Sequence, residues 1–415
     1  MSCASATKPF PPWLTRSQSL SHIRSVLQTL SKREDIRESA RCSSRHQTDP
    51  SSPSHRGSRF SLHIRKTQIN QKYVDYYSVA VGYLPQNLSR NRYMELEPYD
   101  RTRVVVGHGD ETGGEGGEGE GRYLNASWVL ERFGGKWWIA SQAPLPNTAH
   151  PFLSLILQPI TRPPPFLQPS SSLSEAQTSR VRTIIQLTMD VESGRRKAHN
   201  YFPSSVGQSW VIPPEEGCFA SAIKVTLSES QVIEEAHCIQ STISIVPLNP
   251  SVSKGQTYDD NVDYGGENPV TFRHMLYTAW PDHGVPEPKD RASLLAFLRL
   301  VDRTNKDLSL ISYPESSELD PDPPIIVGCS AGIGRTGSFI ALSSLLRAQG
   351  LLGPSSSPAS SSTLPISPLG PLPDALKEDL VVQEVDSLRE QRPGMVQREE
   401  QILLIYEVLA SALLE

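Results

Sequence analysis

Apolar residues along this chain gather in short blocks between polar stretches, and the length and spacing of the blocks predict which elements they form. Four short apolar runs predict strands, at residues 182–187, 223–227, 242–246 and 324–327. Two stretches with apolar residues three and four positions apart predict helices, at residues 338–346 and 397–414. Because strands and helices are interleaved, the pattern predicts an α/β domain.

The first 66 residues lack such a pattern over most of their length. Residues 1–60 hold 14 serines and 10 Lys or Arg against only four Asp or Glu, a composition typical of a disordered tail. One part, residues 17–40, has weakly amphipathic spacing and could form a helix, alone or on a partner. A mitochondrial transit peptide is a further interpretation of this start. We expect a disordered, basic, serine-rich tail over residues 1–66.

The remaining chain, residues 67–415, is expected to be one domain interrupted by surface loops. Its low-complexity insertions have little to bury and lie near residues 107–121, 159–179, 249–269, 306–323 and 353–373. Because the free energy of closing a loop rises only slowly with its length, a stable core tolerates such insertions. No internal repeat is visible, which argues against two similar domains.

Composition excludes several classes of protein. With 40 Lys and Arg against 45 Asp and Glu, the net charge is −5, so nothing indicates nucleic-acid binding. No apolar run approaches the roughly 20 residues of a membrane span, and none near Met1 indicates a secretory signal. Five cysteines without a C-x-x-C pair argue against a disulfide scaffold and against zinc. We expect a cytoplasmic monomer with reduced thiols, with a nuclear location left open.

One segment carries most of the chemical information: Ile325-Ile-Val-Gly-Cys-Ser-Ala-Gly-Ile-Gly-Arg-Thr-Gly-Ser338. An apolar strand ends at a cysteine, three glycines follow, and an apolar helix begins. Glycines let successive N–H groups turn inward, and the helix start adds unpaired N–H donors and the positive end of the helix dipole. The guanidinium of Arg335 can hold two phosphoryl oxygens at once. The segment therefore predicts a cradle for a phosphate dianion.

Cys329 would lie at the base of this positive field. Such a setting lowers the pKa of a thiol from about 8.5 to roughly 3.5–7.5, which gives a nucleophilic thiolate beneath a bound phosphate. The alternative is a glycine-rich turn with an inert, buried cysteine. We favour phosphate chemistry, because the strand, the glycines and the helix all fall where it needs them.

Residues 329–337 resemble the signature loop of the phosphotyrosine-specific, cysteine-dependent protein tyrosine phosphatase family. Other segments resemble further parts of the family, in the family's order. Asn91-Arg-Tyr93 with Pro98-Tyr-Asp100 resembles its substrate-recognition loop, and Tyr123-Leu-Asn-Ala-Ser127 and Trp138-Ile-Ala-Ser-Gln-Ala-Pro-Leu-Pro-Asn147 resemble two core segments. Trp280-Pro-Asp-His-Gly-Val-Pro286 resembles its mobile acid loop, and Gly394-Met-Val-Gln-Arg-Glu-Glu-Gln401 resembles its glutamine loop. The resemblance implies a single catalytic domain with a highly twisted mixed β-sheet flanked by helices. It implies an enzyme of signal transduction that hydrolyses phosphotyrosine in protein substrates.

The same resemblance implies the roles of the reacting groups. Cys329 is the nucleophile that forms a phosphocysteine intermediate, Arg335 clamps the phosphate, and Asp282 is the general acid and then the general base. Thr336 would donate a hydrogen bond to the departing thiolate. The loop amides that hold the phosphate oxygens belong to Ser330, Ala331, Gly332, Ile333, Gly334 and Arg335.

Further side chains have supporting roles by the resemblance. Gln401 would position the attacking water, with Gln397 as its partner. Tyr93 would flank the phosphotyrosine ring and form a slot too deep for phosphoserine. Three residues would hold the machinery in place: Glu192 by pairing with Arg335, Lys197 by contacting the acid loop and Trp280 by anchoring its hinge. No metal or other cofactor is implied, because Arg335 and the amides supply the positive charge.

The chain departs from the family pattern at two points. Gly328 stands where the family usually has a histidine before the cysteine, and Gln142-Ala143 stands where Gln-Gly is common. Losing the histidine removes one contribution to the low pKa of the thiol. We therefore expect the acid limb of kcat/KM to lie at higher pH than in a Gly328→His variant.

Three alternatives to an active tyrosine phosphatase stay open on the sequence. One is a catalytically weakened pseudophosphatase that only binds phosphotyrosine. Another is a phosphatase that acts on lipids, or on both Ser/Thr and Tyr. The last is a scaffold whose tail and insertions dock partners such as a kinase. The physiological substrate cannot be read from the chain.

Overall fold

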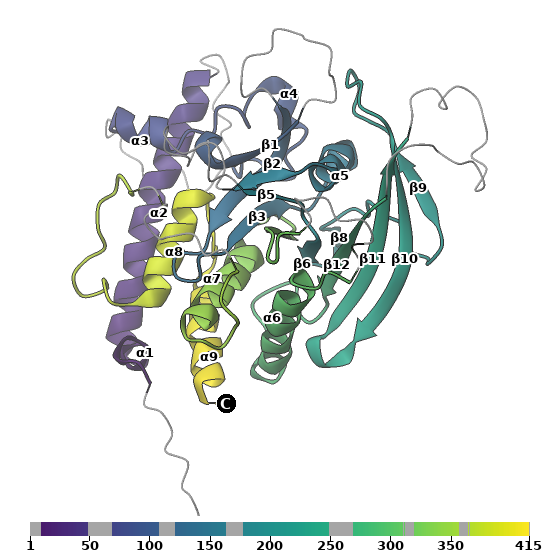
Figure 1. The fold of residues 1–415 in the computed structure, drawn as a ribbon. Coiled ribbons are helices and arrows are strands. Elements are labelled where there is room, and N and C mark those ends of the chain that lie inside the picture. The colour runs from purple at the N-terminus through teal and green to yellow at the C-terminus, as the bar shows by residue number, and fades with distance from the viewer. Residues whose placement is uncertain are drawn as a thin grey trace, which may run out of the picture.

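The computed structural model describes residues 10–48, 69–107, 121–162, 177–248, 269–309, 311, 319–356, 364 and 366–414. In this part of the chain, one mixed sheet of nine strands forms the centre of the molecule (Figure 1). From edge to edge the strands are β1 (Arg103–Val106), β2 (Arg122–Leu130), β3 (Trp137–Gln142), β13 (Ile325–Cys329), β6 (Thr183–Gln186), β12 (Val270–Tyr277), β11 (Cys238–Pro247), β10 (Ile223–Ile233) and β9 (Ser209–Ile212). The four central strands, β3, β13, β6 and β12, run parallel, and the outer pairs are antiparallel. The predicted mixed α/β sheet is confirmed.

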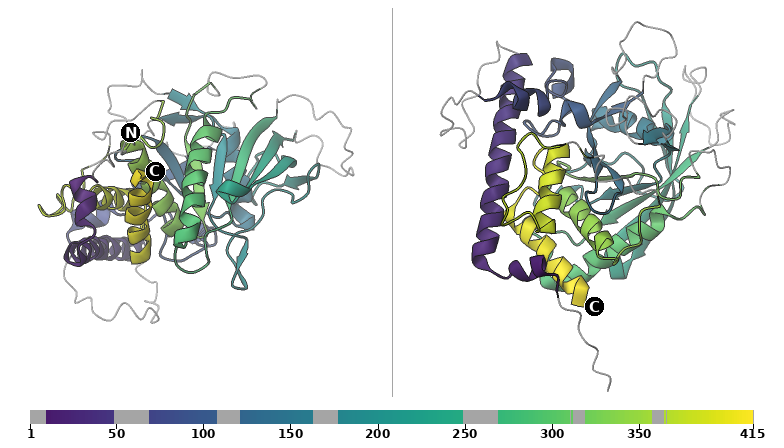
Figure 2. Two further views of the ribbon diagram at one scale, coloured as in Figure 1. Left: turned by 90° about the horizontal axis from the view of Figure 1, so that it is seen from below. Right: turned by 60° about the vertical axis from the view of Figure 1, so that its left-hand side comes forward.

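Helices lie on both sides of this sheet. The described helices are α1 (Pro12–Arg16), α2 (Leu20–Thr48), α3 (Gln71–Tyr76), α4 (Pro85–Leu88), α5 (Ala149–Leu157), α6 (Arg291–Asn305), α7 (Gly334–Ala348), α8 (Leu380–Gln391) and α9 (Glu399–Leu414). The helices α6 to α9 pack on one face, and α5 packs on the other (Figures 1 and 2). Two small hairpins pair β4 (Ile160–Arg162) with β5 (Gln177–Ser179) and β7 (Val191–Glu192) with β8 (Arg195–Arg196).

The central strand β13 is buried on both faces. Ile325 and Val327 point into the core formed with α6 to α9, whereas Ile326 points into the core formed with α5. A strand covered on both sides is expected to be continuously apolar, which is why this run shows no alternation. β13 ends at Cys329, so the predicted nucleophile stands on one of the most deeply packed elements of the fold.

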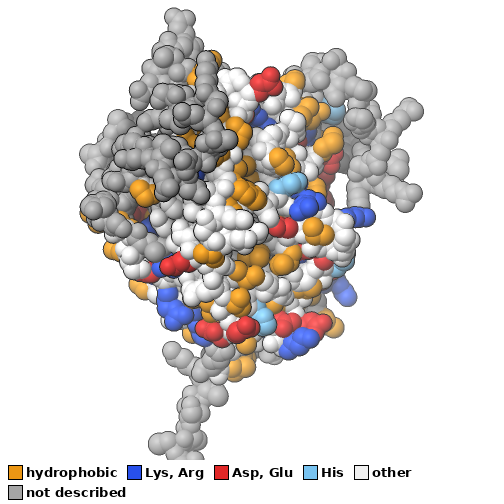
Figure 3. Space-filling view, turned by 90° about the vertical axis from the view of Figure 1, so that its right-hand side faces the viewer, with side chains coloured by type: hydrophobic (Ala, Val, Ile, Leu, Met, Phe, Trp, Pro, Cys, Tyr) orange, Lys and Arg blue, Asp and Glu red, His pale blue; other side chains and the backbone are white. Residues whose placement is uncertain are grey.

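All six elements predicted from apolar patterning are present. The strands at 182–187, 223–227, 242–246 and 324–327 correspond to β6, β10, β11 and β13, and the helices to α7 and α9. β10 extends well past its predicted end, because its polar second half pairs with β11 from Glu229 to Ile233. Figure 3 shows this face of the molecule, and along its lower edge acidic and basic side chains lie side by side.

The prediction of a disordered tail is wrong for its described part, residues 10–48, which include α1 and α2; residues 1–9 and 49–66 lie outside the described residues. Residues 20–48 form the 29-residue helix α2, which lies along α8 (Figure 2). Its apolar residues Val26 and Leu30 are fully buried in the main core. The weak amphipathic pattern therefore did mark a helix, and the catalytic domain predicted to begin at residue 67 includes this earlier segment.

Several arginines on one face of α2 are buried, although their number in the sequence favoured a solvated, disordered tail. Arg37 is fully buried and donates to the carboxylates of Asp386 and Glu390, both at 2.6 Å. Arg33 pairs with Asp386 at 2.9 Å, and Arg45 pairs with Glu97 at 2.7 Å. Four-residue spacing places these side chains on one helix face. Sequence alone could not show that the matching acids lie more than 50 residues away.

The predicted insertions fall mostly outside the described residues. This applies to 108–120, 163–176, 249–268, 312–318 and 357–363, where the prediction is untested. Two flanks that are described belong to the packed domain. Asp322 is buried and pairs with Lys136, and the carbonyl groups of Leu369 and Gly370 accept hydrogen bonds from Arg33. No helix in the described ranges is both long and apolar enough to cross a membrane.

Candidate active site

The loop after β13 forms the floor of a pocket, and its glycines are required by close packing. Gly332 has φ +70°, and a Cβ there would overlap the backbone carbonyl of Ser141. A Cβ on Gly337 would overlap the backbone nitrogen of Val396. The loop therefore turns tightly between β3 and the segment before α9, with α7 starting at Gly334. This is the strand–loop–helix geometry that the sequence predicted.

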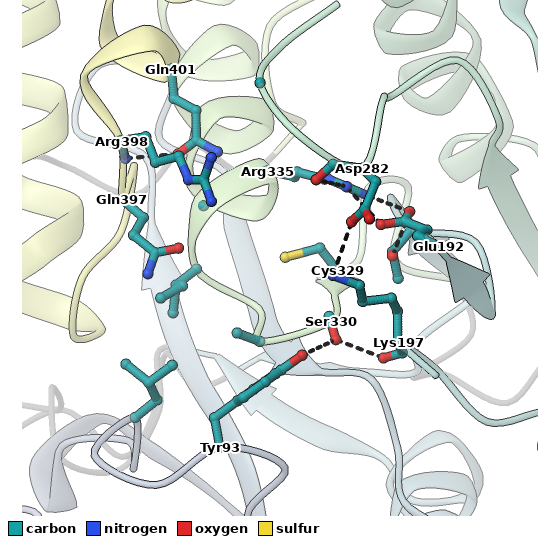
Figure 4. A pocket seen from close by; sticks show the side chains of 16 residues that line it. Tyr93, Glu192, Lys197, Asp282, Cys329, Ser330, Arg335, Gln397, Arg398 and Gln401 are labelled. Atoms are coloured by element: carbon teal, nitrogen blue, oxygen red, sulfur yellow. Dashed lines mark hydrogen bonds and ion pairs between the residues drawn. The ribbon is translucent and has the colours of Figure 1, made fainter. Parts of the chain in front are cut away.

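The pocket has a volume of about 210 Å³ and gathers residues from five distant parts of the chain (Figure 4). It is lined by Tyr93, Leu96, Thr188, Glu192, Lys197, Asp282, Gly284, Cys329, Ser330, Ala331, Ile333, Gly334, Arg335, Gln397, Arg398 and Gln401. Three predicted residues do not line it. Thr336 is buried beneath the loop, Trp280 is buried in the core, and Gly332 faces the supporting side.

Arg335 is held in one orientation by a carboxylate and by backbone carbonyls. Its Nη1 and Nη2 donate to the two carboxylate oxygens of Glu192 at 2.7 and 2.9 Å. Nη1 also donates to the carbonyl of Leu187, and Nη2 donates to the carbonyl of Pro281 at 2.9 Å. The last contact ties the acid loop to the phosphate clamp, so Asp282 is held beside the pocket in this structure.

The setting of Cys329 favours the thiolate. Burial alone would raise the pKa of the thiol, because it penalises the charged form. The hydroxyl of Thr336, the charge of Arg335 and the backbone amides of Thr336 and Ile333 outweigh that effect and lower the pKa below its usual value. The opposite holds for Cys238, a cysteine far from the loop, where burial raises the pKa to about 12.

The surroundings of Asp282 favour its ionised form. Hydrogen bonds from the side chains of Ser193 and Lys197 hold the pKa of this carboxyl well below its ordinary value, against a smaller effect of burial. The ammonium group of Lys197 lies 2.9 Å from Oδ1, and the ring of His283 lies 3.6 Å from Oδ2. The general-acid role that the resemblance implies for Asp282 requires the protonated carboxyl.

Tyr93 forms one wall of the pocket and is fixed by the phosphate loop. Its hydroxyl lies 2.7 Å from Oγ of Ser330, which in turn donates to the backbone carbonyl of Lys197 at 2.7 Å. Arg92, the preceding residue, binds the carbonyls of Ala143 and Pro144 at the end of β3. The recognition segment is thereby tied to the sheet that carries Cys329.

Gln397 and Gln401 approach the loop from the start of α9 (Figure 4). Oε1 of Gln401 accepts the backbone N–H of Arg398 at 3.1 Å, one half of a capping box at the helix start. The amide of Gln401 packs on Gly334, where a Cβ would lie 2.8 Å from Nε2. Both glutamines thus lie where the sequence placed them, beside the phosphate loop.

Sequence reasoning missed Arg392, which supports the phosphate loop from below. This fully buried side chain donates to the carbonyls of Gly332 at 2.7 Å and Ala331 at 3.1 Å, and to Asn125 and Ser127 on β2. Burial lowers its pKa to about 10, against the opposing charges of Tyr123 and Cys329. The only sequence signal is its position two residues before Gly394. Nothing there indicates burial.

Gly328, the residue before the nucleophile, also packs closely. A Cβ at this position would lie 2.8 Å from the backbone carbonyl oxygen of Ser141. Any larger side chain therefore requires β13 to move away from β3. Within the described ranges, no group of three or more His, Cys, Asp or Glu side chains is arranged to hold a metal ion.

Comparison with known proteins agrees with this geometry. The profile of the family described as "Protein-tyrosine phosphatase" matches residues 87–161 and 176–350. Human receptor-type tyrosine-protein phosphatase H is 28% identical over 365 residues, which is 84% of this chain and 24% of that protein. Human receptor-type tyrosine-protein phosphatase eta is 30% identical over 63% of this chain and 15% of its own length. Human tyrosine-protein phosphatase non-receptor type 4 is 28% identical over 64% of this chain and 21% of its own length. The chain thus spans about a quarter or less of each of these relatives.

Proposed function

Because this chain belongs to the protein-tyrosine phosphatase family, we propose that it hydrolyses phosphotyrosine in proteins through a cysteinyl-phosphate intermediate. One observation carries the proposal. The thiol of Cys329, whose pKa is lowered, lies in the same pocket as the guanidinium of Arg335, and Glu192 holds that guanidinium in a bidentate pair. Such a pocket combines a nucleophile with a preformed clamp for phosphoryl oxygens.

The first step transfers the phosphoryl group to sulfur. The thiolate of Cys329 attacks phosphorus, an S–P bond forms, and the bond from phosphorus to the tyrosine oxygen breaks. The amides of residues 330–335 and Arg335 hold the equatorial oxygens, most tightly in the transition state. The departing tyrosine oxygen needs a proton, and the carboxyl of Asp282 supplies it.

Substrate binding would prepare Asp282 for this role. Hydrogen bonds from Ser193 and Lys197 lower the pKa of the carboxyl and favour its ionised form. A phosphate dianion brings like charge close to the carboxylate, and like charge raises a carboxyl pKa. The acid would therefore take up its proton as the substrate arrives.

The second step releases inorganic phosphate. Asp282, ionised after the first step, accepts a proton from water while the water oxygen attacks phosphorus and the S–P bond breaks. Gln401 lies against Gly334 of the loop, a position from which it can orient that water. The hydroxyl of Thr336 stabilises the thiolate that departs.

The wall formed by Tyr93 supports phosphotyrosine as the substrate class. Its hydroxyl is fixed to Ser330, so the ring stands along the pocket above Cys329. A phosphotyrosine ring reaches the bottom of such a slot, whereas a phosphoserine is shorter. A thiolate nucleophile works in a reducing compartment, which supports a cytoplasmic location.

The test measures how fast the purified protein hydrolyses p-nitrophenyl phosphate and matched phosphotyrosine and phosphothreonine peptides. We expect hydrolysis of the phosphotyrosine peptide, its loss in Cys329→Ser, and one phosphate on Cys329 in acid-quenched protein. EDTA should have no effect. Binding of phosphotyrosine without turnover would instead indicate a pseudophosphatase. Faster turnover of phosphothreonine would overturn the substrate class.

A further inference from the structure

The side chain of Arg398 lines the active-site pocket but has no role in the proposed chemistry. Figure 4 shows it on the wall formed by Gln397 and Gln401, across the pocket from Asp282 and Lys197. In the proposed mechanism, Arg335 and the loop amides already bind the phosphate at the bottom of the pocket. Arg398 therefore adds positive charge beside the phosphate site, where neighbouring parts of a substrate pass.

Arg398 differs from the other pocket cations in having no side-chain partner among the residues that the structure describes. Arg335 pairs with Glu192, and Lys197 pairs with Asp282. Among the described residues, no carboxylate lies within ion-pair distance of the Arg398 guanidinium, and no acceptor takes a hydrogen bond from it. An exposed guanidinium with five free donors is suited to bind an anion from outside the chain.

The surrounding structure fixes where this charge is presented. The backbone N–H of Arg398 donates to Oε1 of Gln401, which anchors the residue at the first turn of α9. The acidic residue that follows, Glu399, lines a different groove, formed with Leu27 and Lys32 of α2. The acid that could neutralise Arg398 thus faces away from the pocket, and the helix start adds its own positive end.

We propose that Arg398 is a specificity residue that binds an anionic group carried by the substrate next to its phosphotyrosine. The group is a side-chain carboxylate or a second phosphate on a neighbouring residue of the same peptide. The inference rests on the proposed function, because it assigns a ligand to the rim of that same site.

The experiment compares kcat/KM for three peptides that share one phosphotyrosine and differ in the flanking residues: Glu, Gln or phosphoserine. The wild-type protein is compared with Arg398→Met and Arg398→Glu, and with Arg303→Met as a control. Arg303 is exposed on α6, away from the pocket, so this control removes the same charge elsewhere. We expect the wild type to prefer each anionic peptide over the Gln peptide by about two- to fivefold, the range of an exposed ion pair.

Arg398→Met should bring that ratio close to one, and Arg398→Glu should invert it, while Arg303→Met should retain it. Raising the salt concentration should weaken the wild-type preference. Equal loss on all three peptides would show that Arg398 acts on the shared phosphate, and an unchanged ratio would also refute the proposal. Absence of turnover by every form, including wild type, would refute the proposed function instead.

Discussion

The ammonium group of Lys197 lies 2.9 Å from the carboxylate of Asp282, so the proposed general acid is paired with a cation. Together with a hydrogen bond from Ser193, this pair lowers the pKa of Asp282. An ionised acid cannot protonate a leaving group. The pair therefore couples the readiness of Asp282 to the arrival of negative charge in the pocket.

Replacing Lys197 by Met should shift the pH dependence of kcat. Without the ammonium group the pKa of Asp282 rises, and the acid stays protonated to higher pH, so the basic limb should move upward. We expect this in pH profiles with a phosphotyrosine peptide. Asp282→Asn is the reference. It should lower kcat by about 10²- to 10⁴-fold and abolish that limb. A basic limb at the wild-type position in Lys197→Met would contradict the coupling.

Cys329 should be the first cysteine to react with iodoacetate at pH 6. Its lowered pKa leaves more thiolate at that pH than in Cys238, whose pKa is raised to about 12. Peptide mass spectrometry after brief labelling reports the order of reaction. Vanadate in the pocket should protect Cys329 alone. Labelling of Cys42 before Cys329 would be inconsistent with the predicted thiolate, because burial raises the pKa of Cys42.

Arg392→Met should weaken the phosphate loop and the whole domain. The substitution leaves the buried carbonyl of Gly332 and the partly buried carbonyl of Ala331 without these donors, and an unsatisfied buried group costs about 1–3 kcal/mol. We expect a lower midpoint of urea unfolding and weaker vanadate binding. The second readout is informative, because a purely structural role would lower stability and leave vanadate affinity in the folded protein unchanged.

Gly328→Ala tests how closely β13 and β3 pack before the nucleophile. The new Cβ would lie 2.8 Å from the carbonyl oxygen of Ser141, and overpacking of this kind costs about 1–3 kcal/mol. Thermal unfolding should show the loss. The larger side chain of Gly328→His meets the same carbonyl, so the stability of that variant should be measured before its acid limb of kcat/KM is compared with that of the wild type. An alanine variant as stable as wild type would show that the strands move apart easily.

Arg37→Met should destabilise the protein strongly. It leaves Asp386 and Glu390 buried with one partner fewer, and breaking a buried ion pair on one side costs about 3–5 kcal/mol. Chemical unfolding measures the change. Burial alone would raise the pKa of Asp386. The charges of Arg37 and Arg33 together lower it by more, so the pKa lies below its usual value. The stability gained from Asp386 in the wild type should accordingly be lost as the pH falls through that lowered pKa.

Removing the N-terminal helix α2 tests the same group of buried ion pairs. A chain shortened to residues 67–415 loses α2 and with it Arg33 and Arg37, which pair with acidic residues of α8. We expect it to be less stable than the full chain and prone to aggregate, because Val26 and Leu30 no longer cover the core. Equal stability of the two chains by calorimetry would show that α2 is not part of the cooperative unit.

The local elements of the site follow from short stretches of the amino-acid sequence. An apolar run with no polar interruption predicted β13, the glycines predicted the tight loop, and the resemblance then indicated which distant residues would meet there. These features depend on neighbours in the chain, or on motifs that keep their order, so no knowledge of the packing was needed.

Contacts between charges far apart in sequence depend on how the whole chain packs. Whether Arg37 is solvated or buried depends on acids about 350 residues away. Arg392 reaches the loop carbonyls because the chain that follows α8 packs beneath the loop. The free guanidinium of Arg398 is likewise defined by which carboxylates face elsewhere. The free energy of a charge depends on its burial and on its partners, and both are fixed by the folded chain as a whole.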